Sequence, residues 1–364
     1  MKKNKNYVDL KDQPVPEGQH LLEVDDLKMY FHTVDGVVRA VDGVSYTLDR
    51  GETLGVVGES GSGKSVTAMT IMGLISMPPG KIEGGDVRYR GRSILEMTEE
   101  EMQHIRGNDI AMIFQDPMTS LNPVYKIGKQ VGEGLRLHRG YSKQEALKRA
   151  TELLDLVGIP EPEKRVTEYP HQFSGGMRQR VMIAMALACD PDILIADEPT
   201  TALDVTIQAQ IIELMQEMQK KNGNAIIMIT HDLGVVADMA DKIMVMYAGR
   251  PVEFGTAEEI FYESRQHPYT WGLIRSIPEQ AIDEKKPLTP IHGNPPSLMN
   301  LPEGCVFSPR CPYATDKCRK QRPERVVIES GHYSACHYAG DPEFLKNAPE
   351  TSRTRKDFKK GGEA

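Results

Sequence analysis

The sequence lacks the features by which a chain enters a membrane on its own. The basic N-terminal stretch MKKNKNYVDLKDQPVPEGQH is not followed by an apolar core, so we expect no signal peptide. The longest apolar run, Val181–Cys189, is far shorter than the roughly 20 residues that span a bilayer. Any membrane role is therefore expected to come through a partner.

An excess of positive charge is also absent. The 44 Lys and Arg residues are outnumbered by 52 Asp and Glu, which gives a net charge of −8 and argues against a general nucleic-acid binder. Five cysteines without an export signal predict a reducing compartment, where thiols bind metal or lie in the core. Cys189 lies in the apolar run and is expected to be a core residue.

What the sequence does contain is the stretch GESGSGKS, which fits the phosphate-binding loop G-x-x-x-x-G-K-[ST]. A strand-like run precedes it and a helical run follows it, as that motif requires. Its glycines let successive N–H groups face phosphate oxygens, its lysine can reach the β- and γ-phosphates, and its last serine can ligate Mg²⁺. The predicted nucleotide contacts here are Gly58, Glu59, Ser60, Gly61, Ser62, Gly63, Lys64, Ser65 and Val66.

Short apolar runs alternate with helical patterns from about residue 21 to residue 262, which predicts an α/β fold with a mainly parallel core sheet. The buried strands are expected at 109–114, 193–196 and 225–230, edge strands at 21–24 and 38–41, and a hairpin at 243–254. Helices are expected at 143–157 and 205–221. Beyond about residue 262 the sequence becomes rich in proline and cysteine. We therefore predict a polar tail at 1–20, a nucleotide-binding domain at 21–262, a C-terminal extension at 263–344 and a second polar tail at 345–364.

Further motifs follow the phosphate loop in a specific order. They are a strand ending in Gln115, the string Phe173-Ser174-Gly175-Gly176-Met177, a strand ending in Asp197-Glu198, then Asp204, then His231. This ordered set resembles the ATP-binding cassette (ABC) ATPases, over roughly residues 21–262. The resemblance implies a parallel core sheet with an antiparallel β subdomain and a helical subdomain.

The resemblance assigns a role to each position. Glu198 is the catalytic base, Gln115 and His231 sense the γ-phosphate, and Phe31 stacks on adenine, although the adjacent Tyr30 leaves that assignment open. Ser65, Gln115 and Asp197 are the Mg²⁺ ligands. Asp204 lies at the seam between two ATPase subunits, where Ser174, Gly175 and Gly176 meet the ATP held by the opposite subunit. The family signature usually begins with Leu and ends with Gln, where this chain has Phe173 and Met177.

The C-terminal region contains four cysteines, Cys305, Cys311, Cys318 and Cys336, without the close C-x₂₋₄-C pairs typical of zinc sites. The string around Cys305 and Cys311, with His267-Pro268-Tyr269-Thr270 upstream, resembles the extension of ATPase subunits from bacterial dipeptide and oligopeptide permeases. Several of these subunits carry an iron–sulfur cluster there, so a [4Fe–4S] cluster is predicted. Zinc and thiols without metal are the alternatives, with His332 and His337 as bystanders.

The resemblance therefore implies an ATPase subunit that energises peptide import from the cytoplasmic face of a bacterial membrane. Its cofactors would be ATP and Mg²⁺. Its partners would be two membrane-spanning permease subunits, a second ATPase subunit that is favoured to be non-identical, and, indirectly, an extracytoplasmic solute-binding protein. Importers of nickel or other small solutes remain an alternative. A soluble ABC mechanoenzyme and a non-hydrolysing regulatory module fit less well.

Overall fold

The computed structural model describes residues 10–11, 13–116, 120–200, 205–263, 266–276, 290–329 and 331–348. Its contacts divide the chain into two interleaved units. The first unit comprises Met1–Glu23, Thr47–Glu52 and Arg88–Met228, and the second comprises Val24–Tyr46, Thr53–Val87 and Ile229–Ala364. Across the described ranges, no helix combines the length and apolarity needed to cross a bilayer.

The first unit contains three neighbouring core strands, in the order β8-β7-β6. β6 and β7 run parallel, with Ile110 opposite Ile193, and every residue of β6 and β7 is buried. Such continuous apolar strands are what a parallel sheet covered on both faces requires. The elements are α2 (Glu99–Ile105), β6 (Ile110–Ile113), α4 (Ile127–His138), α5 (Lys143–Leu156), α6 (Pro162–Arg165), η1 (Pro170–Gln172), α7 (Gly175–Leu187), β7 (Ile193–Asp197), α8 (Val205–Asn222) and β8 (Ala225–Ile229).

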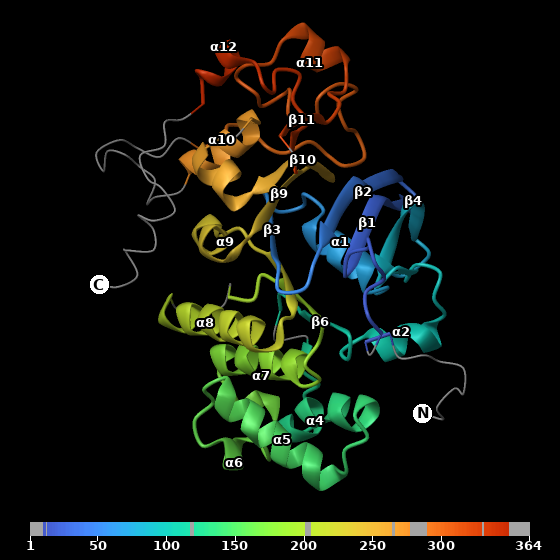
Figure 1. Cartoon of the computed structure of the whole chain (residues 1–364), viewed down its shortest axis with the longest axis vertical. Helices are drawn as coiled ribbons and strands as arrows, with labels where there is room; N and C mark the ends of the chain where they lie inside the picture. The colour runs from blue at the N-terminus through green and yellow to red at the C-terminus, as the bar shows by residue number, and fades with distance from the viewer. Residues whose placement is uncertain are drawn as a thin grey trace. The chain divides into compact units, whose positions relative to one another are not determined.

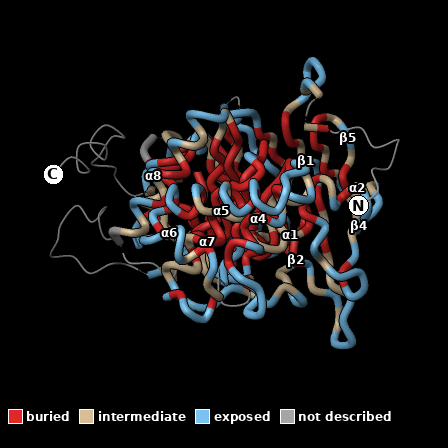
Figure 2. Tube along the Cα trace, turned by 90° about the horizontal axis from the view of Figure 1, so that it is seen from below, coloured by how far each residue is buried: buried red, intermediate tan, exposed pale blue. Residues whose placement is uncertain are grey.

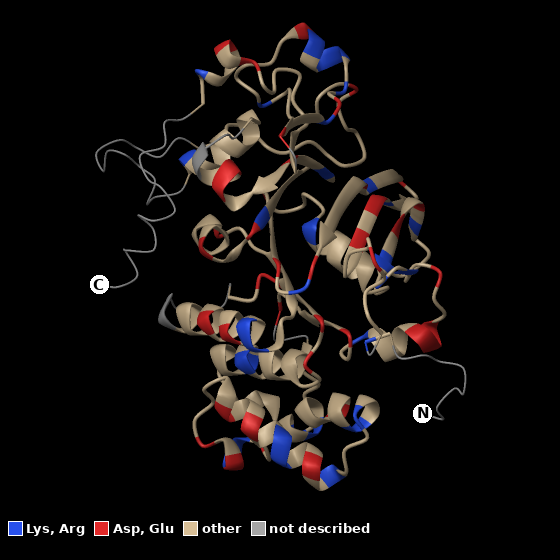
Figure 3. Ribbon diagram, viewed as in Figure 1, with Lys and Arg blue, Asp and Glu red and all other residues tan. Residues whose placement is uncertain are grey.

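Local sequence signals set the helix starts in this unit. Thr98 before α2 and Ser142 before α5 each form a capping box with a glutamate three residues later. The first turn of α2 is acidic, with Glu99, Glu100 and Glu101, and is drawn red in Figure 3. These negative charges stabilise the helix because they lie at the positive end of its dipole. α4, α5 and α7 pack together through their buried faces, and Figure 2 shows buried stretches in red and exposed ones in pale blue along these helices.

The second unit holds a hydrogen-bonded run of strands in the order β11-β12-β10-β9-β3 (Figure 1). β3 pairs parallel with β9, whereas β9–β10, β10–β12 and β12–β11 are antiparallel. The C-terminal strands β11 and β12 therefore extend the sheet that contains the strand before the phosphate loop. The elements are β3 (Thr53–Val57), α1 (Lys64–Ile71), α9 (Leu233–Met239), β9 (Lys242–Tyr247), β10 (Arg250–Thr256), η2 (Glu259–Glu263), α10 (Pro268–Arg275), α11 (Asp316–Lys320), β11 (Val326–Glu329), β12 (His332–Ser334) and α12 (Pro342–Leu345).

A separate sheet has the order β2-β1-β4-β5. β1 (Leu22–Thr33) and β2 (Gly36–Leu48) are much longer than the edge strands predicted for these segments, and β1 lies inside the sheet. β4 spans Gly80–Tyr89 and pairs antiparallel with the short β5 (Arg92–Ser93). With its mixed sheets and interleaved helices the chain is an α/β protein, so the predicted fold class is confirmed.

Candidate nucleotide-binding site

The phosphate loop lies in the second unit, between β3 and α1. Its three glycines have positive φ: 150° at Gly58, 76° at Gly61 and 100° at Gly63. A Cβ atom would lie 2.2 Å from the Met246 carbonyl oxygen at Gly58, and 2.3 Å from the Ala40 carbonyl oxygen at Gly63. Only glycine fits both the backbone conformation and the space at these two positions.

Lys64 is the first residue of α1, and its side chain is 6% exposed. Its ammonium donates to the carbonyl oxygens of Gly58 at 2.7 Å and of Glu59 at 2.9 Å, so the loop curls around the charge. The helix start behind it adds N–H groups and the positive end of the dipole. This loop fits a nucleotide phosphate chain, and Ser65, the next residue, places a hydroxyl where Mg²⁺ would be held.

The predicted carboxylates lie in the first unit at the end of β7. Asp197 is buried at 4% exposure, and Glu198 follows with φ of 47°, a conformation that side chains rarely adopt outside constrained sites. Gln115, after β6, donates from Nε2 to Oε2 of Glu198 at 2.8 Å, across 83 positions of sequence. Two side chains predicted to act at the γ-phosphate are therefore in direct contact.

The predicted signature also lies in the first unit, at the start of α7. Ser174 is the N-cap of this helix, and its hydroxyl accepts a hydrogen bond from the Met177 N–H at 3.3 Å. Ser174 and Gly175 are exposed, and a Cβ on Gly175 would meet open space. An exposed helix start of small residues is suited to contact an anion presented from outside the chain.

The remaining predicted residues are placed as follows. His231 is exposed between β8 and α9, and Phe31 is half-buried on β1, both in the second unit. The hydroxyl of the neighbouring Tyr30 donates to Asp42 at 2.9 Å. Since successive strand residues face opposite sides, Phe31 points away from that contact, which favours it over Tyr30 as the adenine-stacking residue. Asp204 lies outside the described residues.

The predicted iron–sulfur cluster is wrong. In the described part of the chain, which includes all four cysteines of the C-terminal region, there is no group of three or more His, Cys, Asp or Glu side chains that could hold a metal ion. The same finding contradicts the zinc alternative. Burial raises the pKa of Cys311 to about 11 and that of Cys336 to about 12, so without a metal ion these thiols stay protonated at neutral pH.

Aromatic packing supplies a core for the C-terminal region. The Trp271 ring lies 5.6 Å from that of Tyr313 and 5.4 Å from that of Phe344, and Tyr338 lies 5.1 Å from Phe344. Aromatic pairs at these separations contribute beyond the apolar area that they bury. Cys189, as expected, is a core residue at 2% exposure.

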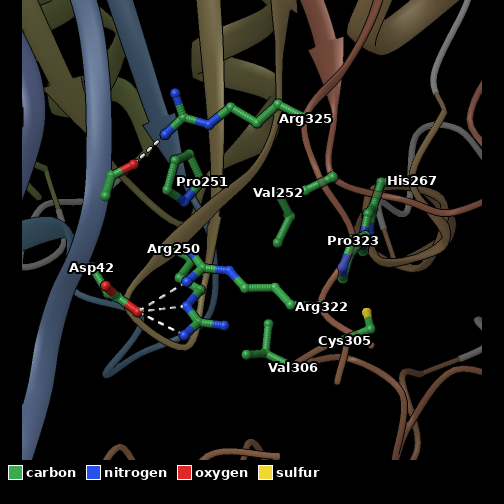
Figure 4. A pocket seen from close by; sticks show the side chains of 12 residues that line it. Asp42, Arg250, Pro251, Val252, His267, Cys305, Val306, Arg322, Pro323 and Arg325 are labelled. Carbon is green, nitrogen blue, oxygen red and sulfur yellow. Dashed lines mark hydrogen bonds and ion pairs between the residues drawn. The ribbon is translucent and has the colours of Figure 1, made fainter. Parts of the chain in front are cut away.

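Charged contacts also join the C-terminal region to β2 and β10 around a small hollow (Figure 4). Asp42 accepts from Arg250 at 2.6 Å, and Arg322 lies 3.7 Å from the same carboxylate. Arg325 donates to the carbonyl oxygen of Gly43. The C-terminal region is thus fixed to the strands beside the phosphate loop.

Two residues that contact the phosphate loop were not predicted from the sequence. Arg310 forms an ion pair with the Glu59 carboxylate, and the Tyr269 hydroxyl accepts a hydrogen bond from the Glu59 N–H. Both residues lie in strings that had been noted for their family resemblance. Their partner could not be identified because the contacts cross more than 200 positions of sequence.

The comparisons with known proteins agree with this geometry. Residues 41–201 match the family profile "ABC transporter", and residues 252–318 match "Oligopeptide/dipeptide transporter, C-terminal region". The chain belongs to the ABC transporter family, which confirms the predicted class of ATPase.

The individual relatives are more specific. The chain is 58% identical to the oligopeptide transport ATP-binding protein OppD of Bacillus subtilis (strain 168), over 86% of this chain and 87% of that protein. It is 51% identical to the dipeptide transport ATP-binding protein DppD of Escherichia coli (strain K12), over 88% and 97%. Among solved structures, the ATP-binding cassette MJ0796, a dimer bound to ADP and Pi, superposes with a TM-score of 0.59 at 28% identity, covering 65% of this chain and 98% of that one.

Proposed function

We propose that this chain is the ATP-hydrolysing subunit that energises import of oligopeptides or dipeptides through a membrane permease. The observation that carries the proposal is the combination of a glycine-built phosphate loop with a C-terminal region of the oligopeptide/dipeptide type on the same chain. The OppD and DppD relatives, at 50–58% identity over most of the chain, support the same activity.

The residues have the following roles in this proposal. The loop from Gly58 to Val66 binds the phosphates of ATP, with Phe31 on adenine. Ser65, Gln115 and Asp197 would hold Mg²⁺, which would offset the negative charge of the phosphates. Glu198 accepts a proton from the attacking water, and its contact with Gln115 at 2.8 Å holds the carboxylate in position before the substrate arrives.

Hydrolysis in this proposal requires two ATPase subunits. The exposed start of α7, with Ser174, Gly175 and Gly176, contacts the γ-phosphate of the ATP bound by the opposite subunit, and Asp204 lies at the seam. His231 contacts the γ-phosphate. The second subunit is a related, non-identical chain, and both dock on two permease subunits at the cytoplasmic face of the membrane. A solute-binding protein delivers the peptide. Residues 21–262 form the ATPase domain and 263–344 the extension.

The test is a Glu198→Gln substitution in the complete transporter. Gln keeps the shape of Glu but removes the base, so hydrolysis should fall by on the order of 10²–10⁴-fold while ATP still binds. The exposed Glu213 on α8 offers a matched control, because Glu213→Gln makes the same chemical change away from the site. Hydrolysis by Glu198→Gln at a rate close to that of Glu213→Gln would reject the assignment.

The transported solute is tested separately. A strain that lacks this subunit should fail to grow on dipeptides or longer peptides as the amino-acid source, and the wild-type chain should restore growth where Glu198→Gln does not. The opposite result would be a deletion strain that still uses peptides but grows poorly on limiting nickel until the wild-type chain is restored. That result would identify a metal ion, not a peptide, as the transported solute.

A further inference from the structure

Glu59, the second residue of the phosphate loop, is held by the C-terminal region. Its carboxylate accepts two hydrogen bonds from Arg310, Nη1 to Oε2 at 2.5 Å and Nη2 to Oε1 at 3.0 Å. Its backbone N–H donates to the Tyr269 hydroxyl at 2.8 Å. The main chain and the side chain of the loop are therefore both held by residues that follow Glu59 by more than 200 positions in the sequence.

Arg310 is also held in place by contacts other than the one with Glu59. Its Nε donates to the carbonyl oxygen of His292 at 2.9 Å, and its Nη2 donates to that of Ile291 at 3.2 Å. Its Nη1 lies 3.4 Å from the Tyr247 hydroxyl, and the side chain is only 4% exposed. A guanidinium with this many partners holds one orientation, which makes the paired contact with a carboxylate specific.

The pair matters because of what the loop must bind. A carboxylate at position 59 places negative charge in a loop that receives a polyanion, and without a counter-charge it would repel the phosphates. The carbonyl oxygen of Glu59 also accepts from the Lys64 ammonium at 2.9 Å, so the position of Glu59 decides where the phosphate-binding lysine lies. Arg310, Glu59 and Lys64 thus form a chain of contacts from the C-terminal region to the phosphate site.

We propose that Arg310 is a positioning residue for ATP binding, and that the C-terminal region is thereby a part of the nucleotide site. Arg310 neutralises Glu59 and fixes the loop around Lys64. The inference rests on the proposed function only in that the loop binds ATP. Because binding couplings are reciprocal, bound ATP should in turn hold the C-terminal region more firmly.

The test is a double-mutant cycle on the full chain, with the affinity for MgATP measured by calorimetry. Arg310→Gln leaves the Glu59 carboxylate without its counter-charge and should weaken binding by at least about tenfold. Glu59→Gln removes the repelling charge, and the double substitution should bind MgATP with the affinity of Glu59→Gln, well above that of Arg310→Gln. Arg319→Gln, at an exposed ion pair with Asp316 in the same region, is the matched control.

Rescue in the double variant separates an electrostatic role from a structural one, because a variant that merely disrupts packing would not be repaired by a second substitution. Arg310→Lys keeps the charge but loses the paired geometry, so its affinity for MgATP should lie between those of the wild type and Arg310→Gln. This variant takes the place of Arg310→Gln in the cycle if Arg310→Gln does not fold. Arg310→Gln within about twofold of wild type, or a double variant as weak as Arg310→Gln, would overturn the inference.

Amide hydrogen exchange gives a second readout. MgATP should slow exchange at Arg310 and Cys311, whose N–H groups bond to the Phe307 carbonyl oxygen, in the wild type and not in Arg310→Gln. Lys64→Ala distinguishes this inference from the proposed function. Failure of the wild-type chain to bind MgATP would refute both, whereas binding that is lost in Lys64→Ala and unchanged in Arg310→Gln would refute the role of Arg310 alone.

Discussion

His267 makes the stability of the second unit depend on pH. This histidine is the N-cap of α10, and its Nδ1 accepts a hydrogen bond from the Tyr269 N–H at 3.1 Å. Its ring is 1% exposed and lies 5.8 Å from that of Phe307, while its backbone N–H donates to the Glu253 carboxylate at 3.1 Å. Burial lowers the pKa of His267 to about 3, so the folded chain keeps the ring neutral.

The sign of the effect follows from where the proton binds. An unfolded chain protonates this histidine below pH about 6.5, whereas the folded chain does so only near pH 3. Between these values the unfolded state holds the extra proton, so the free energy of unfolding decreases as the pH decreases. The slope is about 1.4 kcal/mol per pH unit, which gives a loss of about 2 kcal/mol between pH 7 and pH 5.

The assay is urea unfolding followed by the fluorescence of Trp271, the one tryptophan of the chain, which lies on α10 itself. His267→Asn keeps an N-cap acceptor and removes the titrating group. The wild type should lose about 2 kcal/mol more than this variant from pH 7 to pH 5. His171→Asn, at an exposed histidine of the other unit, should keep the wild-type pH dependence. Parallel curves for wild type and His267→Asn would refute the reasoning.

Three further outcomes are expected. Lys64→Ala should weaken MgATP binding at least about tenfold in calorimetry, because it removes the charge around which the loop curls. Gly63→Ala should do the same, since its Cβ would lie 2.3 Å from the Ala40 carbonyl oxygen, while the circular dichroism spectrum stays close to wild type. Arg90→Met should lower the free energy of unfolding by about 3 kcal/mol in urea titrations, because Asp192, 5% exposed, loses its 2.5 Å ion-pair partner.

Much of the fold could be predicted because the signals are local. Lys143–Val157 was expected to be a helix and α5 spans Lys143–Leu156, since Ser142 and Glu145 form the capping box that starts it. The buried strands β6, β7 and β8 were predicted from short apolar runs, and their observed bounds agree with the predicted ones to within one residue. The segments predicted for β1 and β2 were too short, because both strands continue through polar and exposed residues that carry no apolar signal.

The contacts within the site could not be predicted in the same way. The sequence order identified Gln115 and Glu198, but the 2.8 Å hydrogen bond between them depends on the pairing of β6 with β7. Cysteine spacing likewise gave the wrong prediction for the C-terminal region, because spacing alone does not place four sulfur atoms in ligand geometry. The aromatic packing there comes from residues spread between Trp271 and Phe344.

The way in which the C-terminal region is attached decides how its role can be tested. β12 pairs with β10, β10 with β9, and β9 with β3, the strand that leads into the phosphate loop. Deleting this region would therefore remove the two strands β11 and β12 and expose the backbone of β10, whatever it does to nucleotide binding. A change at Arg310 leaves this ladder in place and removes the charge beside Glu59, together with the hydrogen bonds that Arg310 donates to the carbonyl oxygens of Ile291 and His292. Loss of ATP affinity in Arg310→Gln, repaired by Glu59→Gln, is therefore the outcome that a purely structural extension cannot produce.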